Sequence, residues 1–379
     1  MRSVVPEGWL KGQLSSIATL EYGKSPNHVR QEEGLYPIVG TSGIVGTANQ
    51  YLWGEKSVVI GRKGTINKPI YIETPFWAID TTYFCKFAED TDPKWFYYKV
   101  CEEQLEKHNE ASGVPSLSRE TLRGLPIEIP PLPEQKKIAS ILTSVDEVIE
   151  NTQKQIDKLQ DLKKATMNEL LTKGIGHAEF KDSELGRIPK SWEIYKVSDL
   201  LTNSKQKAQK NLPIYSVLMD GGMIPRTSVD RRVESNLSDE DNLFAPKDSL
   251  VYNMMRMWQG ASGIAPVNCL VSPAYVVCLT TGLISSDFLG YLMKSEESVQ
   301  KLRRYSQGIT GDRMRLYFQH FQEIKFSIPP IGEQRKIAKI IDAVSVLLER
   351  KHKKLTQTQS LKKSLMQDLL TGKIRVTVN

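Results

Sequence analysis

One segment of this sequence occurs twice, and this internal repeat constrains the fold more than any other feature. Residues 129–175 and 328–374 align without a gap at a separation of 199 residues, and 21 of the 47 aligned positions are identical. A more variable region precedes each copy. The repeat therefore predicts two equivalent halves, each made of a variable module followed by a shared segment.

Each shared segment is expected to form one long helix. A Pro-Pro pair ends the preceding strand, and good helix formers continue from Glu134 to Gly174 and from Glu333 to Gly372. The stretch from Glu134 to Lys173 would span ~60 Å at ~1.5 Å per residue. An apolar stripe of spacing 3 and 4 follows Ile138, Leu142, Val145, Ile149, Ile156 and Leu159, and its counterpart follows Ile337, Ile341, Val344, Leu348 and Leu355. Two matching stripes in one chain favour pairing of the helices with each other over pairing with a second chain.

The two variable regions, 1–128 and 188–327, are predicted to be α+β modules. Gly and Pro break them into short runs rich in β-formers, and one helical stretch is expected in each, at 93–107 and at 286–305. The expected strands are 57–60, 69–72, 83–85, 249–252 and 274–279. Residues 176–187 resemble a polar linker. The fold class is therefore α+β, with a pseudo-two-fold internal repeat. The predicted domains are 1–128, 129–175, 188–327 and 328–379.

Composition excludes several classes of protein. With 40% hydrophobic and 25% charged residues the chain has a globular composition, and no apolar run approaches the ~20 residues that a membrane span needs. The N-terminus lacks the apolar core of a secretory signal. The four cysteines form no C-x-x-C pair, which argues against a zinc or redox motif and favours reduced thiols in a cytoplasmic protein.

Two similar modules on a stiff helical spacer suit a protein that reads two separated sites on one polymer. DNA is the natural candidate, because equivalent groove faces recur every ~34–36 Å. A scaffold with two protein-binding modules would have the same repeat, so this alternative stays open at this point. A self-contained methylating enzyme lacks support, because the sequence has no Asn/Asp-Pro-Pro-aromatic motif and no Gly-x-Gly-x-x-Gly.

The amino-acid sequences of two segments resemble those of a known protein family. The repeated start Ile-Pro-Pro-x-x-Glu-Gln-x-Lys-Ile-Ala and the stretch from Asp182 to Trp192 resemble the specificity subunit of type I restriction–modification systems. The resemblance implies two target recognition domains on an antiparallel coiled coil, reading a split double-stranded DNA target. It also implies docking of two methyltransferase subunits and of restriction subunits. This subunit would be non-catalytic and would hold no metal or cofactor, with S-adenosylmethionine, ATP and Mg²⁺ bound by its partners.

Candidate DNA contacts follow from residue chemistry, since Lys, Arg and hydroxyls contact phosphate and Arg or Asn forks contact base edges. In the first module the candidates are Thr41, Ser42, Arg62, Lys63, Thr65, Lys68, Ser112 and Ser116. In the second they are Lys205, Lys207, Arg226, Asn253, Arg256, Arg303, Arg304, Thr310 and Arg313. For the turn around Arg62 the alternative is a solvated hairpin tip, and for Arg303 and Arg304 it is an exposed helix face.

Candidate partner-docking residues lie at the start of each shared helix: Glu134, Gln135, Glu333 and Gln334. An acidic first turn would also suit the positive end of a helix, so capping alone could explain these side chains.

The basic charge is unevenly distributed. The net charge is +7, yet residues 1–128 hold 14 Lys and Arg against 16 Asp and Glu, whereas 328–379 hold 11 against 4. The first module must therefore contact DNA through local clusters, and we expect weak DNA binding by this chain alone.

Overall fold

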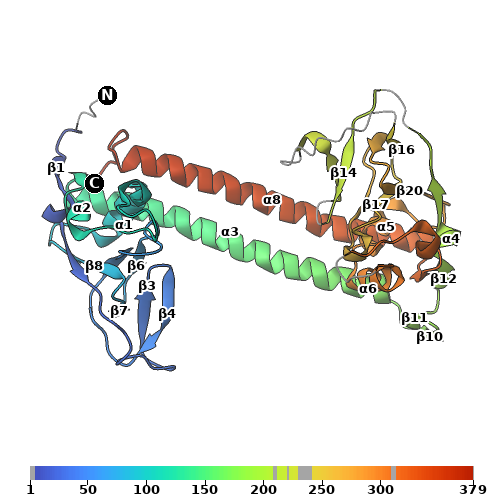
Figure 1. Cartoon of the computed structure of the whole chain (residues 1–379), viewed down its shortest axis with the longest axis horizontal. Helices are drawn as coiled ribbons and strands as arrows, with labels where there is room; N and C mark the ends of the chain where they lie inside the picture. Colours follow the sequence, from blue (N-terminus) through green and yellow to red (C-terminus); the bar gives the residue numbers. More distant parts are fainter. Residues whose placement is uncertain (1–4, 208–210, 220–221, 229–240, 309–312, 379) are drawn as a thin grey trace. The chain divides into compact units, whose positions relative to one another are not determined.

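The computed structural model describes residues 5–207, 211–219, 222–228, 241–308 and 313–378. The chain forms two compact units: unit 1 is Met1–Lys154 with His352–Asn379, and unit 2 is Gln155–Lys351 (Figure 1). Each unit thus combines one module with a part of each long helix. Among the described helices, none is long and apolar enough to cross a membrane.

The shared segments form the long helices α3 (Leu132–Lys173) and α8 (Ile331–Leu369), as predicted. Every residue of the two expected stripes is buried or half-buried. Thr152, which interrupts the first stripe between Ile149 and Ile156, is buried too, and its hydroxyl donates to the carbonyl of Val148 at 2.7 Å. Lys351, the equivalent residue of α8, instead donates to Gln155 of α3 at 2.7 Å.

In each unit the start of one long helix packs with the end of the other. The core of unit 1 contains Ile138 and Leu142 of α3 together with Leu369 of α8. The core of unit 2 contains Leu171 of α3 together with Ile337 of α8. The two helices therefore run antiparallel within each unit and form part of both hydrophobic cores.

Unit 1 holds a small α+β module. Its strands are β1 (Leu10–Gln13), β2 (Ala18–Tyr22), β3 (Tyr36–Gly40), β4 (Gly43–Ala48), β5 (Ser57–Gly61), β6 (Ile70–Ile72), β7 (Trp77–Ala78), β8 (Thr82–Phe87) and β9 (Pro126–Ile129). Its helices are α1 (Pro93–Glu102) and α2 (Arg119–Arg123), with short 3₁₀ turns η1 (Leu14–Ser16) and η2 (Leu105–His108). The sheets have the orders β2-β8-β5-β6, β4-β3-β7 and β1-β9.

Unit 2 repeats this plan with different loops. Its strands are β10 (Phe180–Ser183), β11 (Gly186–Pro189), β12 (Glu193–Lys196), β13 (Leu201–Ser204), β14 (Tyr215–Leu218), β15 (Gly222–Pro225), β16 (Leu243–Ala245), β17 (Leu250–Asn253), β18 (Ser262–Ile264), β19 (Cys269–Val271), β20 (Tyr275–Thr280) and β21 (Lys325–Ile328). Its helices are α4 (Val197–Leu200), α5 (Ser286–Leu292), α6 (Glu296–Tyr305) and α7 (Phe318–Phe321), with 3₁₀ turns η3 (Arg226–Ser228) and η5 (Met257–Gln259).

The sheet topology shows that the repeat extends into the modules. The four-stranded sheet β13-β20-β17-β18 has the order of β2-β8-β5-β6, and β12-β21 corresponds to β1-β9. Cys85 and Cys278 are fully buried at matching places in β8 and β20. Sequence-diverged modules therefore share one backbone plan, and their surface loops differ.

Three predicted segments differ from the structure. The helix expected over 286–305 is two helices, because the Ser295 hydroxyl accepts from the Ser298 amide and begins a new helix. The helix expected over 93–107 ends at Glu102, because Gln104 adopts a left-handed backbone conformation with φ of 50°, and η2 follows as a separate turn. Residues 176–187, expected as a linker, contribute to the hairpin β10–β11. The predicted domain limits stay a prediction, and unit 1 combines residues from both ends of the chain.

Candidate nucleic-acid interface

A glutamate at the start of each long helix joins that helix to its module. In unit 1 the Trp9 indole donates to Glu134 at 3.0 Å, and Arg375 donates to both Glu134 oxygens at 2.8 Å each. In unit 2 the Trp192 indole donates to Glu333 at 3.2 Å, and Glu333 also pairs with His177 at 2.7 Å.

A glutamine next to each glutamate makes three hydrogen bonds. Gln135 accepts from the amide of Asp92 at 2.8 Å and donates to the carbonyls of Asp90 and Pro130 at 3.1 and 2.9 Å. Asp92 is the N-cap of α1. Gln334 repeats the pattern, accepting from the amide of Ser285, the N-cap of α5, at 2.8 Å and donating to the carbonyls of Leu283 and Pro329 at 2.9 Å each.

These contacts bear on the docking prediction. Gln135 and Gln334 are 1% and 0% exposed, and Glu134 is 3% exposed. Buried side chains whose polar atoms already have partners are not free to bind a second protein. Docking through Glu134, Gln135, Glu333 and Gln334 stays a prediction, whereas the structure gives each of them an intrachain role.

A tyrosine of each module also contacts both long helices. In unit 1 the Tyr98 hydroxyl donates to Asp146 of α3 at 2.8 Å, and Lys362 of α8 lies over the Tyr98 ring at 5.4 Å. In unit 2 Tyr291 donates to Asp342 of α8, and Lys163 of α3 lies over its ring at 6.0 Å. Matching polar contacts thus join α1 of unit 1 and α5 of unit 2 to the long helices.

The predicted turn around Arg62 lies against the segment that leads into α2. We call Tyr22 with residues 61–66 and 115–119 the unit 1 loop site. Leu117 N donates to the Arg62 carbonyl at 3.0 Å, and Gly64 N donates to the Pro115 carbonyl at 2.9 Å. Arg62 and Arg119 lie over the ring of Tyr22, at 5.4 and 4.9 Å from its centroid. An exposed aromatic ring thus carries two cations at this site.

The buried residue Tyr83 hydrogen-bonds to the backbone of this site. Burial, with a contribution from neighbouring Tyr22, raises the pKa of Tyr83 to about 12. The phenol therefore stays protonated near neutral pH and donates to the Leu117 carbonyl at 3.2 Å.

The other predicted residues of the first module divide into two groups. Thr41 lies beside the unit 1 loop site, since a Cβ on Gly64 would be 3.8 Å from its hydroxyl, and Lys63 bridges to Ser116 within the site. Thr65 belongs to the same turn. Ser42, Lys68 and Ser112 are exposed, and no described contact brings their side chains to the site.

Unit 2 builds the same backbone arrangement with different side chains. Leu316 N donates to the Met254 carbonyl at 2.9 Å, which matches the bond from Leu117 to Arg62 because Leu117 and Leu316 are 199 residues apart. Gln307 and Arg315 exchange two backbone hydrogen bonds at 2.9 and 2.8 Å. We call the described residues 253–259, 307–308 and 313–317 the unit 2 loop site.

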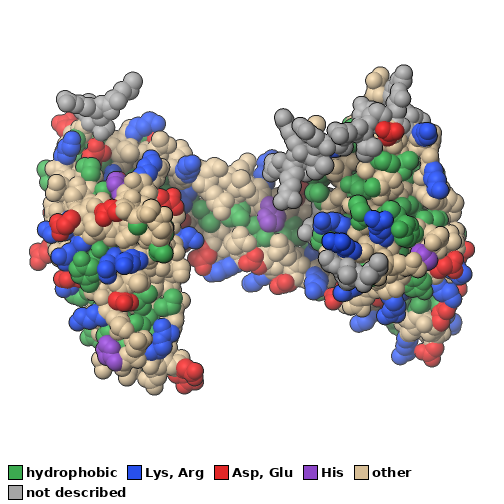
Figure 2. Space-filling model, viewed as in Figure 1, with side chains coloured by type: hydrophobic (Ala, Val, Ile, Leu, Met, Phe, Trp, Pro, Cys, Tyr) green, Lys and Arg blue, Asp and Glu red, His purple; other side chains and the backbone are tan. Residues whose placement is uncertain are grey.

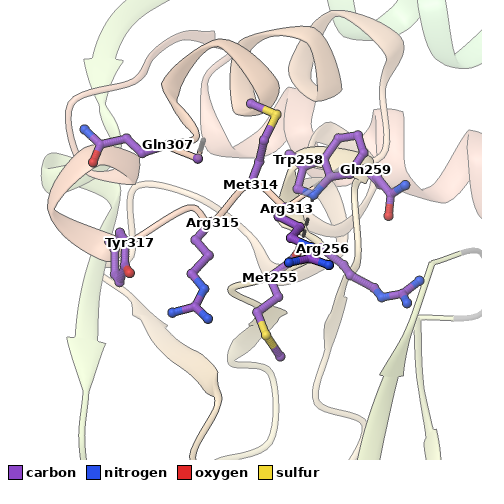
Figure 3. A pocket seen from close by; sticks show the side chains of 10 residues that line it. Met255, Arg256, Trp258, Gln259, Gln307, Arg313, Met314, Arg315 and Tyr317 are labelled. Atoms are coloured by element: carbon purple, nitrogen blue, oxygen red, sulfur yellow. Dashed lines mark hydrogen bonds between the residues drawn. The ribbon is translucent and has the colours of Figure 1, made fainter. Parts of the chain in front are cut away.

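The unit 2 loop site surrounds a hollow of about 960 Å³. Its lining combines arginines with aromatic, thioether and amide side chains: Met255, Arg256, Trp258, Gln259, Gln307, Gly308, Arg313, Met314, Arg315 and Tyr317 (Figure 3). Figure 2 shows Lys and Arg side chains beside exposed hydrophobic ones on one face of unit 2. Cations interleaved with apolar and aromatic groups are typical of nucleic-acid-binding surfaces.

The structure gathers some of the residues predicted for the second module. Arg256 and Arg313 line the hollow, and Arg303 lies over the Trp258 ring at 5.8 Å. Lys205 lines a second hollow of about 540 Å³ that shares Tyr317. Asn253 lies at the edge of the unit 2 loop site, where it ends β17 and accepts a hydrogen bond from Met255 N. Arg304 is exposed on α6, Lys207 forms a β-bridge with Leu243, and Arg226 begins η3. Thr310 lies outside the described residues.

Sequence reasoning missed Tyr22 and Arg119 in unit 1 and Trp258 and Arg315 in unit 2. One available signal was the repeat, because Arg315 is 199 residues after the predicted Ser116. The role of all these residues in DNA contact stays a prediction.

The chain is similar to known proteins over nearly its whole length. The family described as type I restriction modification DNA specificity domain matches residues 6–161 and 189–357. The type I restriction enzyme MjaVIII specificity subunit of Methanocaldococcus jannaschii is 26% identical, over 98% of this chain and 94% of that protein. The type I restriction enzyme EcoBI specificity subunit of Escherichia coli is 24% identical, over 57% of this chain and 50% of that protein. The crystal structure of the S subunit from the M. genitalium type I restriction–modification system has a TM-score of 0.64 at 16% identity, covering 97% of both chains.

Proposed function

Because the chain belongs to the family of type I restriction–modification DNA specificity domains, we propose that it reads a split double-stranded DNA target with its two modules and recruits methyltransferase and restriction subunits to it. The two loop sites read one half of the target each. Family membership favours this function over the protein-binding scaffold.

One observation carries this proposal: both modules present a cationic and aromatic surface at the same point of one backbone plan. In unit 1 the surface consists of Arg62 and Arg119 on Tyr22. In unit 2 it consists of Arg256 and Arg315 beside Trp258. Equivalent position argues for a common ligand class, and different side chains argue for different base sequences in the two half-sites.

Exposed apolar residues on the long helices support docking of two copies of one methyltransferase subunit. Unit 1 exposes Val148 and Leu361, by 41% and 53%, and unit 2 exposes the repeat equivalents Leu347 and Leu162, by 41% and 52%. Because the repeat places the same pair on both units, each unit offers the same surface to one partner copy.

The chemistry belongs to the partners in this proposal. The chain acts as the non-catalytic specificity subunit, and S-adenosylmethionine, ATP and Mg²⁺ are bound by the methyltransferase and restriction subunits. The chain contributes position: its loop sites select the sequence, and its helices hold the methyltransferase subunits near the target adenines.

The proposal is tested by sequencing the methylome of cells with and without this gene. We expect one split adenine-methylation motif to disappear when the gene is deleted and to return when it is restored. An unchanged methylome would refute the proposed function, as would S-adenosylmethionine turnover by the purified chain alone.

A further inference from the structure

We propose that Arg256, Arg313 and Arg315 determine part of the sequence specificity by reading guanine in the half-site of unit 2. This inference rests on the proposed function and goes further, since it assigns a base and the residues that contact it. The ligand feature is the major-groove edge of guanine, whose O6 and N7 accept two parallel hydrogen bonds from one guanidinium.

The three guanidinium groups are available for a ligand. Among the described residues, none makes a hydrogen bond or ion pair to the side chain of Arg256, Arg313 or Arg315. All three residues are exposed, and all three line the same hollow (Figure 3). Arg375, by contrast, is engaged within unit 1, since its guanidinium donates to both oxygens of Glu134. Three guanidinium groups without a partner among the described residues line one hollow, which indicates that a bound ligand accepts their hydrogen bonds.

The walls of this hollow are held in place by contacts within unit 2. The Trp258 indole donates to the Met255 carbonyl at 3.1 Å, and Arg303 of α6 lies over its ring. Two backbone hydrogen bonds tie Arg315 to Gln307. A Cβ on Gly308 would meet the Arg313 carbonyl at 2.5 Å, so only glycine permits this close approach. Preorganised donors lose less entropy on binding, which suits discrimination between bases.

The composition of the lining favours base reading over phosphate binding. The described cations of the lining are arginines, and no lysine is among them. Guanidinium groups form planar, two-bond contacts, whereas ammonium groups act as point charges. Met255, Trp258 and Tyr317 add apolar surface, which fits base edges and thymine methyl groups better than a hydrated phosphate.

The test uses methylome sequencing of cells that express the full chain with its methyltransferase partners. Arg256, Arg313 and Arg315 are replaced singly by Ala and by Lys. We expect at least one Ala variant to accept other bases at one guanine position, with discrimination there falling roughly 5- to 150-fold. The matching Lys variant keeps the charge but lacks the fork, so it should not restore discrimination.

Arg187→Ala is the matched control, because Arg187 is an exposed arginine of the hairpin β10–β11, outside the loop site. Its motif and methylated fraction should equal those of the wild type. If the Ala variants lower methylation equally at all sites with an unchanged motif, and Lys restores it, the arginines contact phosphate and the inference is overturned. The same holds if no variant changes motif or extent. In both cases the wild-type split motif would leave the proposed function standing, whereas its absence would refute that function instead.

Discussion

Replacing Gln135 by Ala tests whether the start of α3, which the repeat shares with α8, serves the fold or a partner. The variant loses three hydrogen bonds and leaves the carbonyls of Asp90 and Pro130 and the amide of Asp92 without their partner. An unpaired buried polar group costs about 1–3 kcal/mol. Only the bond to Pro130 is fully buried, so we expect a loss of about 2–5 kcal/mol for unit 1.

Hydrogen exchange of the purified chain locates this loss. Exchange should rise in α1, whose N-cap the glutamine holds, while α5 in unit 2 keeps its protection. Gln334→Ala should instead raise exchange in α5 of unit 2 and leave α1 of unit 1 protected. Lys136→Ala is the control, since this exposed neighbour should change stability by less than about 0.5 kcal/mol. Unchanged exchange combined with lost methyltransferase binding would refute the structural role and support docking through this side chain.

Three further predictions concern DNA contact, partner docking and the joint between module and helix. Arg62→Ala should weaken specific DNA binding of the assembled complex by about 1–3 kcal/mol; an unchanged footprint would contradict this. Replacing Leu162 and Leu361 together by Glu should abolish co-purification with the methyltransferase subunit without lowering the melting temperature of the chain, because both side chains are exposed. Tyr98→Phe removes the hydrogen bond to Asp146 and should destabilise unit 1 by about 1–2 kcal/mol in thermal unfolding, and an unchanged Tm would count against that contact.

The sequence predicts the regular elements well because their signals are local. Periodic apolar residues and Pro-Pro starts define α3 and α8, and short runs of β-formers define strands such as β5 and β20. The break between α5 and α6 was missed because a single Ser295 cap begins the new helix inside a run of helix formers.

The loop sites are harder to predict because long-range contacts create them. Arg256 and Arg313 are far apart in sequence and line one hollow because the segment before α7 hydrogen-bonds to Met254, the residue after β17. Trp258 showed no pattern of its own, and its place beside Arg303 depends on the packing of η5 against α6. Residue chemistry thus found individual cations, whereas the aromatic groups beside them required the fold.

Unit 1 is built from two separate segments of the chain, and this determines the order in which the two hydrophobic cores are completed during synthesis. Unit 2 is one continuous segment, whereas unit 1 needs residues 352–379 to cover Ile138 and Leu142 with Leu369 and Leu370. The first module to leave the ribosome is therefore the last to finish folding. Its apolar surface stays uncovered while about 200 more residues are synthesised, at a rate of ~5–20 residues per second. A premature stop codon near the C-terminus would therefore destabilise the N-terminal module of unit 1 and leave the module of unit 2 intact, although the truncation lies closer in sequence to unit 2.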